Sequence, residues 1–237
     1  MNIMNKDIFA GLQKLTLLDF PGYVASTLFT RGCHMRCPFC HNSALVTRAD
    51  EQKMYTNEEI LAFLKKRQGI LDGVAITGGE PTLEHGLPEF LERVRELGYK
   101  IKLDTNGTRP EVLKDIVSRG LVDYVAMDIK NSREKYGATV GFNEKYDLTP
   151  IDESIAFLMS GRVDFEFRTT VSKTFHTADD LLEIAKWIHG DEKYFLQQFK
   201  DSGDVIGSDI KGYDNDEMRA LLDKILPFVP NAQLRGV

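Results

Sequence analysis

The sequence predicts an α/β fold built on a parallel β-sheet, and three observations support this prediction. Short runs of β-branched and aromatic residues alternate along the chain with longer segments of helical periodicity. Several of the helical segments begin at a capping residue and end just before a glycine. Strands that alternate with helices pair in parallel through right-handed crossovers. The sequence therefore predicts either an incomplete (β/α) barrel or an open, doubly wound sheet.

The extended runs predict six strands, at Tyr23–Thr30, Leu71–Thr77, Lys100–Asp104, Tyr124–Ile129, Val163–Thr170 and Tyr194–Phe199. Six helices are expected between and after them, at Asn57–Lys66, Leu87–Leu97, Pro110–Arg119, Ile151–Met159, Ala178–His189 and Glu217–Phe228. Six units are fewer than the eight that close a complete (β/α) barrel. We therefore expect the sheet to stay open.

Capping signals mark the helix boundaries. Three hydroxyl residues stand three positions ahead of an acid, as in a capping box: Thr56 before Glu59, Thr149 before Asp152 and Thr177 before Asp180. Four glycines follow predicted helices, where glycine adopts the left-handed conformation of a C-cap: Gly98, Gly120, Gly161 and Gly190. These signals support the order and the lengths of the predicted elements.

Composition limits the classes of function. The 237 residues are 42% hydrophobic and contain no Pro/Gly/Ser-rich linker, so we expect one domain over residues 1–237, with residues 1–21 as an extension packed on it. A net charge of −6 argues against a nucleic-acid partner. No apolar run approaches the ~20 residues of a membrane span, and Met1–Lys6 shows no export signal. We therefore expect no membrane association and a cytoplasmic location.

Three cysteines, Cys33, Cys37 and Cys40, lie directly after the first predicted strand with the spacing C-x-x-x-C-x-x-C. An odd number of cysteines within one loop is typical of metal or redox chemistry rather than of a disulfide framework. A structural zinc ion needs a fourth ligand, which His34 or His41 can supply. A four-iron cluster on three thiolates instead keeps one iron open to a cofactor or substrate. Because the sequence has no second pair of cysteines, the cluster is favoured.

Further polar residues and glycines follow the other strands. They are Gly78, Gly79 and Glu80 after the second, Asp104 and Thr105 at the third, Asp128 and Lys130 at the fourth, and Arg168 within the fifth. The carboxyl ends of parallel strands share one edge of a sheet, where ligands bind in α/β proteins. Two adjacent glycines allow close approach to the main chain. Taken alone, the charged residues also fit surface ion pairs or helix caps.

The cysteine spacing, with Phe39 just before the last cysteine, resembles that of the radical S-adenosylmethionine (SAM) enzymes. The resemblance implies an incomplete (β/α)6 barrel in which Cys33, Cys37 and Cys40 hold a catalytic [4Fe–4S] cluster. The open iron would bind the amino and carboxylate groups of SAM. One electron would then cleave SAM to methionine and a 5′-deoxyadenosyl radical. Flavodoxin or ferredoxin is the implied electron donor.

The resemblance also implies roles for the residues at the strand ends. Gly78, Gly79 and Glu80 are similar to the family's glycine-rich segment beside the cofactor amino group, with Phe39 also near the cofactor. The Asp-Thr-Asn-Gly and Asp-x-Lys motifs are similar to those of the activating enzymes of glycyl-radical proteins. That similarity implies a monovalent-cation site at Asp104, Thr105 and Asp128. It also implies that Lys130 holds the cofactor carboxylate and that Arg168 approaches the cofactor.

One departure concerns the end of the sixth strand, where Lys200 stands in place of the histidine of pyruvate formate-lyase activating enzymes. The contacts to the adenosine part of SAM are therefore not predicted. His176 and His189 are interpreted as structural or surface residues. The polar segment Lys200–Asp216 is expected to be a mobile surface loop, or else a lid or docking loop.

The segment Gly11–Gly22 (GLQKLTLLDFPG) and the residues around the cysteines closely resemble the activating-protein family of anaerobic ribonucleoside-triphosphate reductase. The resemblance implies that the radical abstracts hydrogen from a glycine of that reductase. Three alternatives stay open: activation of pyruvate formate-lyase or another glycyl-radical enzyme, radical chemistry on a small molecule, and a non-catalytic zinc-binding interaction protein. With only three cysteines, no auxiliary cluster is expected.

Overall fold

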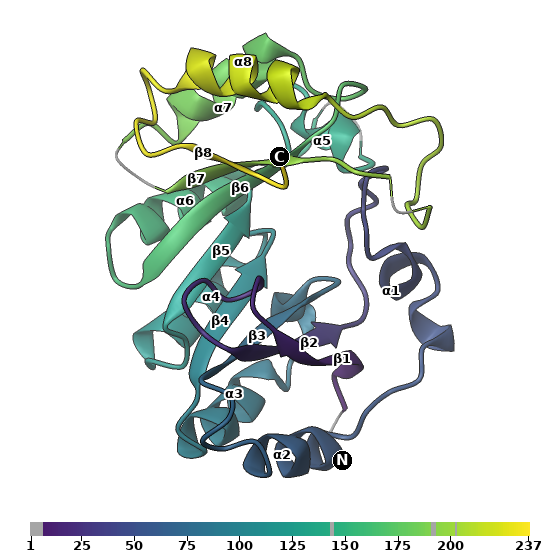
Figure 1. Cartoon of the computed structure of the whole chain (residues 1–237), viewed down its shortest axis with the longest axis vertical. Helices are drawn as coiled ribbons and strands as arrows, with labels where there is room; N and C mark the ends of the chain where they lie inside the picture. The colour runs from purple at the N-terminus through teal and green to yellow at the C-terminus, as the bar shows by residue number, and fades with distance from the viewer. Residues whose placement is uncertain (1–6, 143–144, 191–192, 202) are drawn as a thin grey trace.

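A single eight-stranded sheet forms the centre of the computed structural model, which describes residues 7–142, 145–190, 193–201 and 203–237. The strands follow one another across the sheet in chain order, β1 to β8 (Figure 1). β1 (Phe9–Thr16) pairs antiparallel with β2 (Ala25–Thr30), and every later pair of neighbours is parallel. β1 and β8 lie at the two edges, so the sheet is open.

The remaining strands are β3 (Gly73–Gly78), β4 (Lys100–Thr105), β5 (Tyr124–Asp128), β6 (Asp164–Val171), β7 (Tyr194–Gln198) and β8 (Gln233–Arg235). The six predicted strands are confirmed to within two residues. Because each parallel strand lies beside its predecessor in sequence, the sheet winds in one direction. The incomplete barrel is therefore confirmed, and the doubly wound alternative is wrong.

The helices are α1 (Ser43–Thr47), α2 (Asn57–Lys65), α3 (Leu87–Glu96), α4 (Pro110–Ser118), α5 (Tyr136–Thr139), α6 (Thr149–Met159), α7 (Ala178–Trp187) and α8 (Asn215–Ile225). The six predicted helices are confirmed, whereas α1 and α5 are too short to show periodicity. α3 buries Leu87, Phe90, Leu91 and Val94, a spacing that places one apolar stripe against the sheet. No helix in the described ranges is long and apolar enough to cross a membrane.

The capping predictions hold at two helices and fail at one. The boxes at Thr56 and Thr177 form as expected, since each side chain accepts from the backbone N–H three residues on. Thr149 instead lies inside α6, and its N–H donates to the Asp147 carboxylate at 2.9 Å. Asp147 was overlooked because Thr149 fits the capping-box spacing equally well.

The N-terminal extension is described from residue 7 onward, so residues 1–6 lie outside the described part. It forms β1 and a turn whose Phe20 side chain is 1% exposed. The Phe20 ring packs against Tyr23 and Tyr124 and covers Gly73, where a Cβ atom would lie 2.9 Å from it. The turn therefore packs over the amino ends of β3 and β5, opposite the predicted site.

Candidate active site

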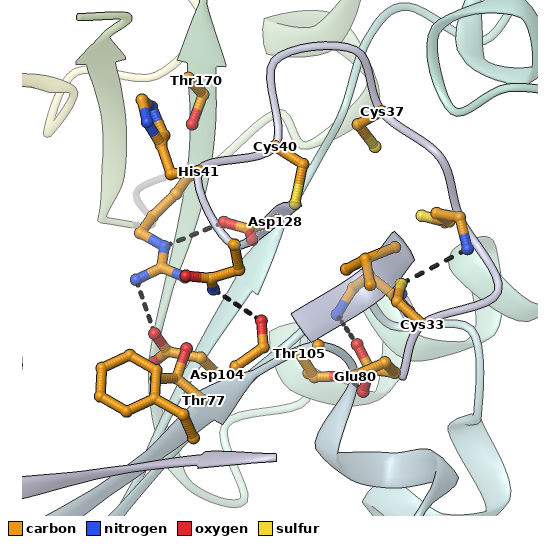
Figure 2. Close-up of a pocket in the computed structure, with 18 of the residues that line it drawn as sticks. Cys33, Cys37, Cys40, His41, Thr77, Glu80, Asp104, Thr105, Asp128 and Thr170 are labelled. Carbon is orange, nitrogen blue, oxygen red and sulfur yellow. Dashed lines mark hydrogen bonds and ion pairs between the residues drawn. The ribbon is translucent and has the colours of Figure 1, made fainter. Parts of the chain in front are cut away.

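A cavity of about 360 Å³ lies against the concave face of the sheet and at the carboxyl ends of its strands. Its lining includes all twelve residues predicted for the site: Cys33, Cys37, Phe39, Cys40, Gly78, Gly79, Glu80, Asp104, Thr105, Asp128, Lys130 and Arg168. Figure 2 shows the three cysteines along one winding loop, with Asp104 and Asp128 on neighbouring strands. The structure thus brings together residues from five strand ends.

Backbone hydrogen bonds hold the loop that carries the cysteines. Gly32 N–H donates to the Leu45 carbonyl at 2.8 Å, and Arg36 N–H donates to the Val140 carbonyl at 2.9 Å. The Cys40 N–H closes a turn onto the Cys37 carbonyl at 3.0 Å. These bonds fix the loop at several points along its length.

All three thiols are free, and burial shifts their acidity. Burial raises the pKa of the Cys33 thiol to about 12 and that of Cys37 to about 11. It also raises the pKa of Cys40. Metal binding requires the thiolate, so a bound metal centre would displace these protons. In the described part of the chain, no three His, Cys, Asp or Glu side chains converge on a single metal ion. An iron–sulfur cluster needs no such convergence, because each thiolate binds a different iron.

Phe39 packs inward from the same loop. It is 3% exposed, lines the cavity and contacts the rings of Phe175 and His176, at centroid distances of 5.6 and 5.7 Å. His176 is itself buried, and its Nε2 atom lies 2.8 Å from the Lys130 carbonyl oxygen. The aromatic residue before the last cysteine therefore braces the loop against the segment after β6.

The glycines after β3 lie directly against the cysteine loop. A Cβ atom on Gly79 would lie 1.9 Å from the Gly32 carbonyl oxygen, and one on Gly78 would lie 2.3 Å from the Thr30 oxygen. The same Gly32 oxygen accepts a hydrogen bond from Glu80 N–H at 2.8 Å. The close approach expected at these glycines is therefore made by the main chain of residues 30–32.

Glu80 is 1% exposed and accepts four hydrogen bonds. Its donors are the N–H and hydroxyl of Thr82, at 3.1 and 2.5 Å, the Thr105 hydroxyl at 2.7 Å and the Asn106 N–H at 2.7 Å. Burial raises the pKa of Glu80, while the four donors act to lower it. Glu80 thus joins the loop after β3 to the loop after β4 and orients the glycine segment.

A charged network crosses the concave face. The Arg168 guanidinium donates through Nε to Asp128 at 3.0 Å and through Nη1 to Asp104 at 3.1 Å. Lys130 donates to Asp128 at 2.9 Å, and the buried Lys102 pairs with Asp104. Burial alone would raise the pKa of Asp104 and Asp128, but these cations outweigh it and hold both pKa values below the ordinary one. Both carboxylates are therefore ionised.

The predicted monovalent-cation ligands are adjacent, yet their oxygens already have partners. Each carboxylate contacts two cationic side chains, and the Thr105 hydroxyl donates to Glu80 while it accepts from Gly107 N–H at 3.1 Å. The oxygen donors suit a hard cation in type. In this arrangement, however, they do not fit a further cation unless Arg168 moves.

Several residues in or beside the cavity were not predicted. Lys102 is buried beside the cavity, two residues before Asp104 on β4, so strand alternation places both on the same face and they pair. Gln197 on β7 and Gln13 on β1 line the cavity, but isolated glutamines carry no motif. Asn42 donates to the Gly78 carbonyl at 2.7 Å and was overlooked because it follows the cysteine motif.

Lys200 is exposed and does not appear in the cavity lining. His41 does line the cavity, and its ring stacks on Phe199 with centroids 5.4 Å apart. A histidine thus lies at the carboxyl end of β7, although it comes from the cysteine loop. His189 is exposed, as expected.

Comparison with known proteins identifies the family. The model of the "Radical SAM superfamily" matches residues 27–188. The chain belongs to the radical SAM superfamily. Enzymes of this superfamily use a [4Fe–4S] cluster and SAM, which agrees with the cofactors expected from the sequence.

Relatives of this radical SAM chain differ in chemistry. It is 31% identical over 240 residues to "Putative glycyl-radical enzyme activating enzyme MJ1227" of Methanocaldococcus jannaschii, covering 98% of this chain and 97% of that protein. It is 36% identical over 138 residues to a 7-carboxy-7-deazaguanine synthase of Koribacter versatilis, covering 57% of this chain and 56% of that one.

Solved structures show the same fold. Streptococcus suis SuiB matches this radical SAM chain with a TM-score of 0.67 at 15% identity, over 87% of this chain and 47% of that one. The protein anSMEcpe with bound AdoMet matches with a TM-score of 0.57 at 18% identity, over 83% and 57%. The chain thus spans about half the length of these two structures.

Proposed function

We propose that this radical SAM enzyme activates a glycyl-radical enzyme, with Cys33, Cys37 and Cys40 as the ligands of its [4Fe–4S] cluster. Two observations support the proposal. The similarity to the M. jannaschii protein extends over 98% of the chain. The three thiols also line one cavity with the glycine segment and the charged network. When bound, a reduced cluster supplies the electron that cleaves SAM to methionine and a 5′-deoxyadenosyl radical.

The chain's own residues position the cofactor. The backbone at Gly78 and Gly79 borders the cavity, where it would contact the amino group of SAM. Lys130 and Arg168 supply positive charge for its carboxylate, and Lys is a compact point charge well suited to this contact. Phe39 closes the apolar side of the cavity. Asp104 and Asp128 hold Arg168 in place, and Asp128 also holds Lys130. A monovalent cation at Asp104, Thr105 and Asp128 stays part of the proposal and requires that Arg168 moves.

The proposed substrate is the α-carbon of a glycine in a protein partner. The partner that we favour is anaerobic ribonucleoside-triphosphate reductase. The N-terminal segment and the motifs around the cysteines support this partner, with flavodoxin or ferredoxin as the electron donor. The sheet is open, with β1 and β8 as its edges, and we propose that a peptide segment of the partner enters from this open side. Pyruvate formate-lyase and other glycyl-radical enzymes are alternative partners. The partial match to a 7-carboxy-7-deazaguanine synthase favours a small molecule as the second candidate substrate.

Anaerobic reconstitution with iron and sulfide tests the cluster. We expect about four irons per chain, since three thiolates hold one cubane, together with reductive cleavage of SAM. Cys37→Ser is expected to remove both, whereas His34→Gln is expected to keep both. Zinc bound with unit stoichiometry and no SAM cleavage would support the interaction-protein alternative.

Electron paramagnetic resonance tests the partner. The reduced enzyme with SAM is incubated with anaerobic ribonucleotide reductase, and we expect the doublet of a glycine-centred radical. The matched control is the reductase with its radical-bearing glycine changed to alanine, which should give no doublet. A doublet only with pyruvate formate-lyase would change the partner. SAM cleavage stimulated only by a small molecule would refute the protein substrate.

A further inference from the structure

The segment between β7 and α8 passes directly over the cysteine loop. Gly207 N–H donates to the Pro38 carbonyl at 2.8 Å, between Cys37 and Cys40 in sequence. The Ser43 hydroxyl, just after Cys40, donates to the Asp204 carboxylate at 2.5 Å. Two contacts from one segment therefore bracket Cys40 on both sides.

Gly207 approaches the cysteine loop too closely for any side chain. A Cβ atom at this position would lie 2.7 Å from Pro38 Cβ, 3.3 Å from Pro38 Cα and 3.2 Å from the Ile210 side chain. Gly207 is not among the described glycines with positive φ, so an alanine there meets no backbone strain. The requirement for glycine at position 207 therefore comes from its contact with Pro38.

The other end of the segment is attached to the residues that follow β6. Lys173 N–H donates to the Lys211 carbonyl at 2.7 Å, and Lys211 N–H donates to the Thr174 hydroxyl at 2.9 Å. Gly212 forms an isolated antiparallel bridge with Ser172. The segment is thus anchored at both ends, on the cysteine loop and on the residues after β6.

We propose that residues 203–212 form a clasp that fixes the Cys37–Cys40 turn and so keeps the thiolates in position around the cluster, with Gly207 and Asp204 as its positioning residues. The proposal rests on the cluster ligation proposed above. The clasp acts on the side of the loop that carries Pro38 and Ser43, while the thiols face the cavity. It gives a defined role to part of the Lys200–Asp216 segment, which the sequence predicts as a mobile surface loop or else as a lid or docking loop.

Gly207→Val tests the clasp, with Ser208→Val as the matched control because Ser208 is the exposed neighbour. Both proteins are reconstituted anaerobically, and iron content, midpoint potential and the rate of absorbance loss in air are measured. We expect several-fold faster bleaching and a shifted potential for Gly207→Val, and values of the unaltered protein for Ser208→Val. Equal bleaching and potential in the two variants would overturn the clasp.

Substitutions at Asp204 and Ser43 are milder, and they test the clasp if Gly207→Val fails to fold. Asp204→Ala, Ser43→Ala and the double variant are expected to bleach faster than the unaltered protein, and the double variant no faster than the quicker single variant. Asp204→Asn keeps an acceptor oxygen and is expected to restore the slow rate. Additive effects, or no effect, would overturn the clasp. If the unaltered protein takes up no iron, the cluster assignment fails instead, whatever the variants do.

Discussion

The Nε atom of Arg168 lies 3.0 Å from Oδ1 of Asp128, which is its direct partner in the pairing of β5 with β6. Through Nη1 the same guanidinium reaches Asp104 on β4, so one side chain links three strands. Burial would lower the pKa of Arg168, but the two carboxylates outweigh it and raise that pKa. Arg168 is therefore a permanent cation at the centre of the concave face.

Replacing Arg168 with Gln is expected to lower the free energy of unfolding by about 3 kcal/mol, the low end for a broken buried ion pair, because Lys102 and Lys130 remain. SAM binding should weaken, and it should depend more steeply on K⁺ than in the unaltered protein, since two carboxylates lose a shared cation. Denaturant titration and calorimetry in potassium and tetramethylammonium buffers measure these effects. Arg168→Lys keeps the charge but cannot bridge both carboxylates. Unchanged stability and affinity in Arg168→Gln would contradict this role.

Gly79→Ala is expected to prevent correct packing of the cysteine loop, because its Cβ atom would lie 1.9 Å from the Gly32 oxygen. Gly98→Ala is the control, since Gly98 has φ of 84° and open space around it. The control should cost only about 1 kcal/mol of backbone strain. Iron content after reconstitution and the unfolding midpoint measure the difference. A Gly79→Ala protein with full iron content would refute the close approach.

A second ion pair joins the end of β8 to the buried Glu166 on β6. Arg235 on β8 donates two hydrogen bonds, at 2.8 and 3.1 Å, to Glu166, which is 0% exposed. Arg235→Ala is expected to destabilise the fold by about 3–5 kcal/mol, because Glu166 keeps an unpaired buried charge. Adding Glu166→Gln should recover part of this loss, since the amide still accepts from Tyr124. Denaturant titration measures both variants, and equal losses in the two would count against the ion pair.

His176 predicts an acid-sensitive contribution to stability. Burial lowers its pKa below the ordinary 6.5, with Asp180 acting to raise it and Lys135 to lower it. The unfolded chain therefore binds more protons below pH 6.5, and stability is lost as the pH falls from 6.5. Unfolding free energies measured down to about pH 5 should show this slope, because histidine is the side chain that titrates there. His176→Gln should reduce the slope, and an unchanged slope would contradict the assignment.

The fold and the location of the site were predictable because both depend on local patterns. Alternating strands and helices fix a parallel sheet, and the carboxyl ends of such strands meet at one edge. The order of the residues along the chain is therefore enough to place Cys33, Asp104 and Asp128 together. The short α1 and α5 were not predictable, because four or five residues show no helical period.

The contacts within the site depend on long-range packing, which local patterns do not encode. Ser43 and Asp204 are 161 residues apart in sequence, and neither belongs to a recognisable motif. The sequence indicated Arg168 as a cofactor contact, but not as the bridge between Asp104 and Asp128. The glycine at position 79 was expected to admit a ligand, whereas its nearest neighbour is the Gly32 main chain.

β1 and β8 stand at opposite margins of the described sheet, and no strand joins them. A closed barrel can be entered only at its two ends, whereas an open sheet can also be approached from the side, between its two edge strands. A segment that continues at both ends into a folded protein has no terminus to thread. For the protein substrate proposed above, the open sheet means that a mid-chain segment can bind and leave without passing a chain end through a closed ring.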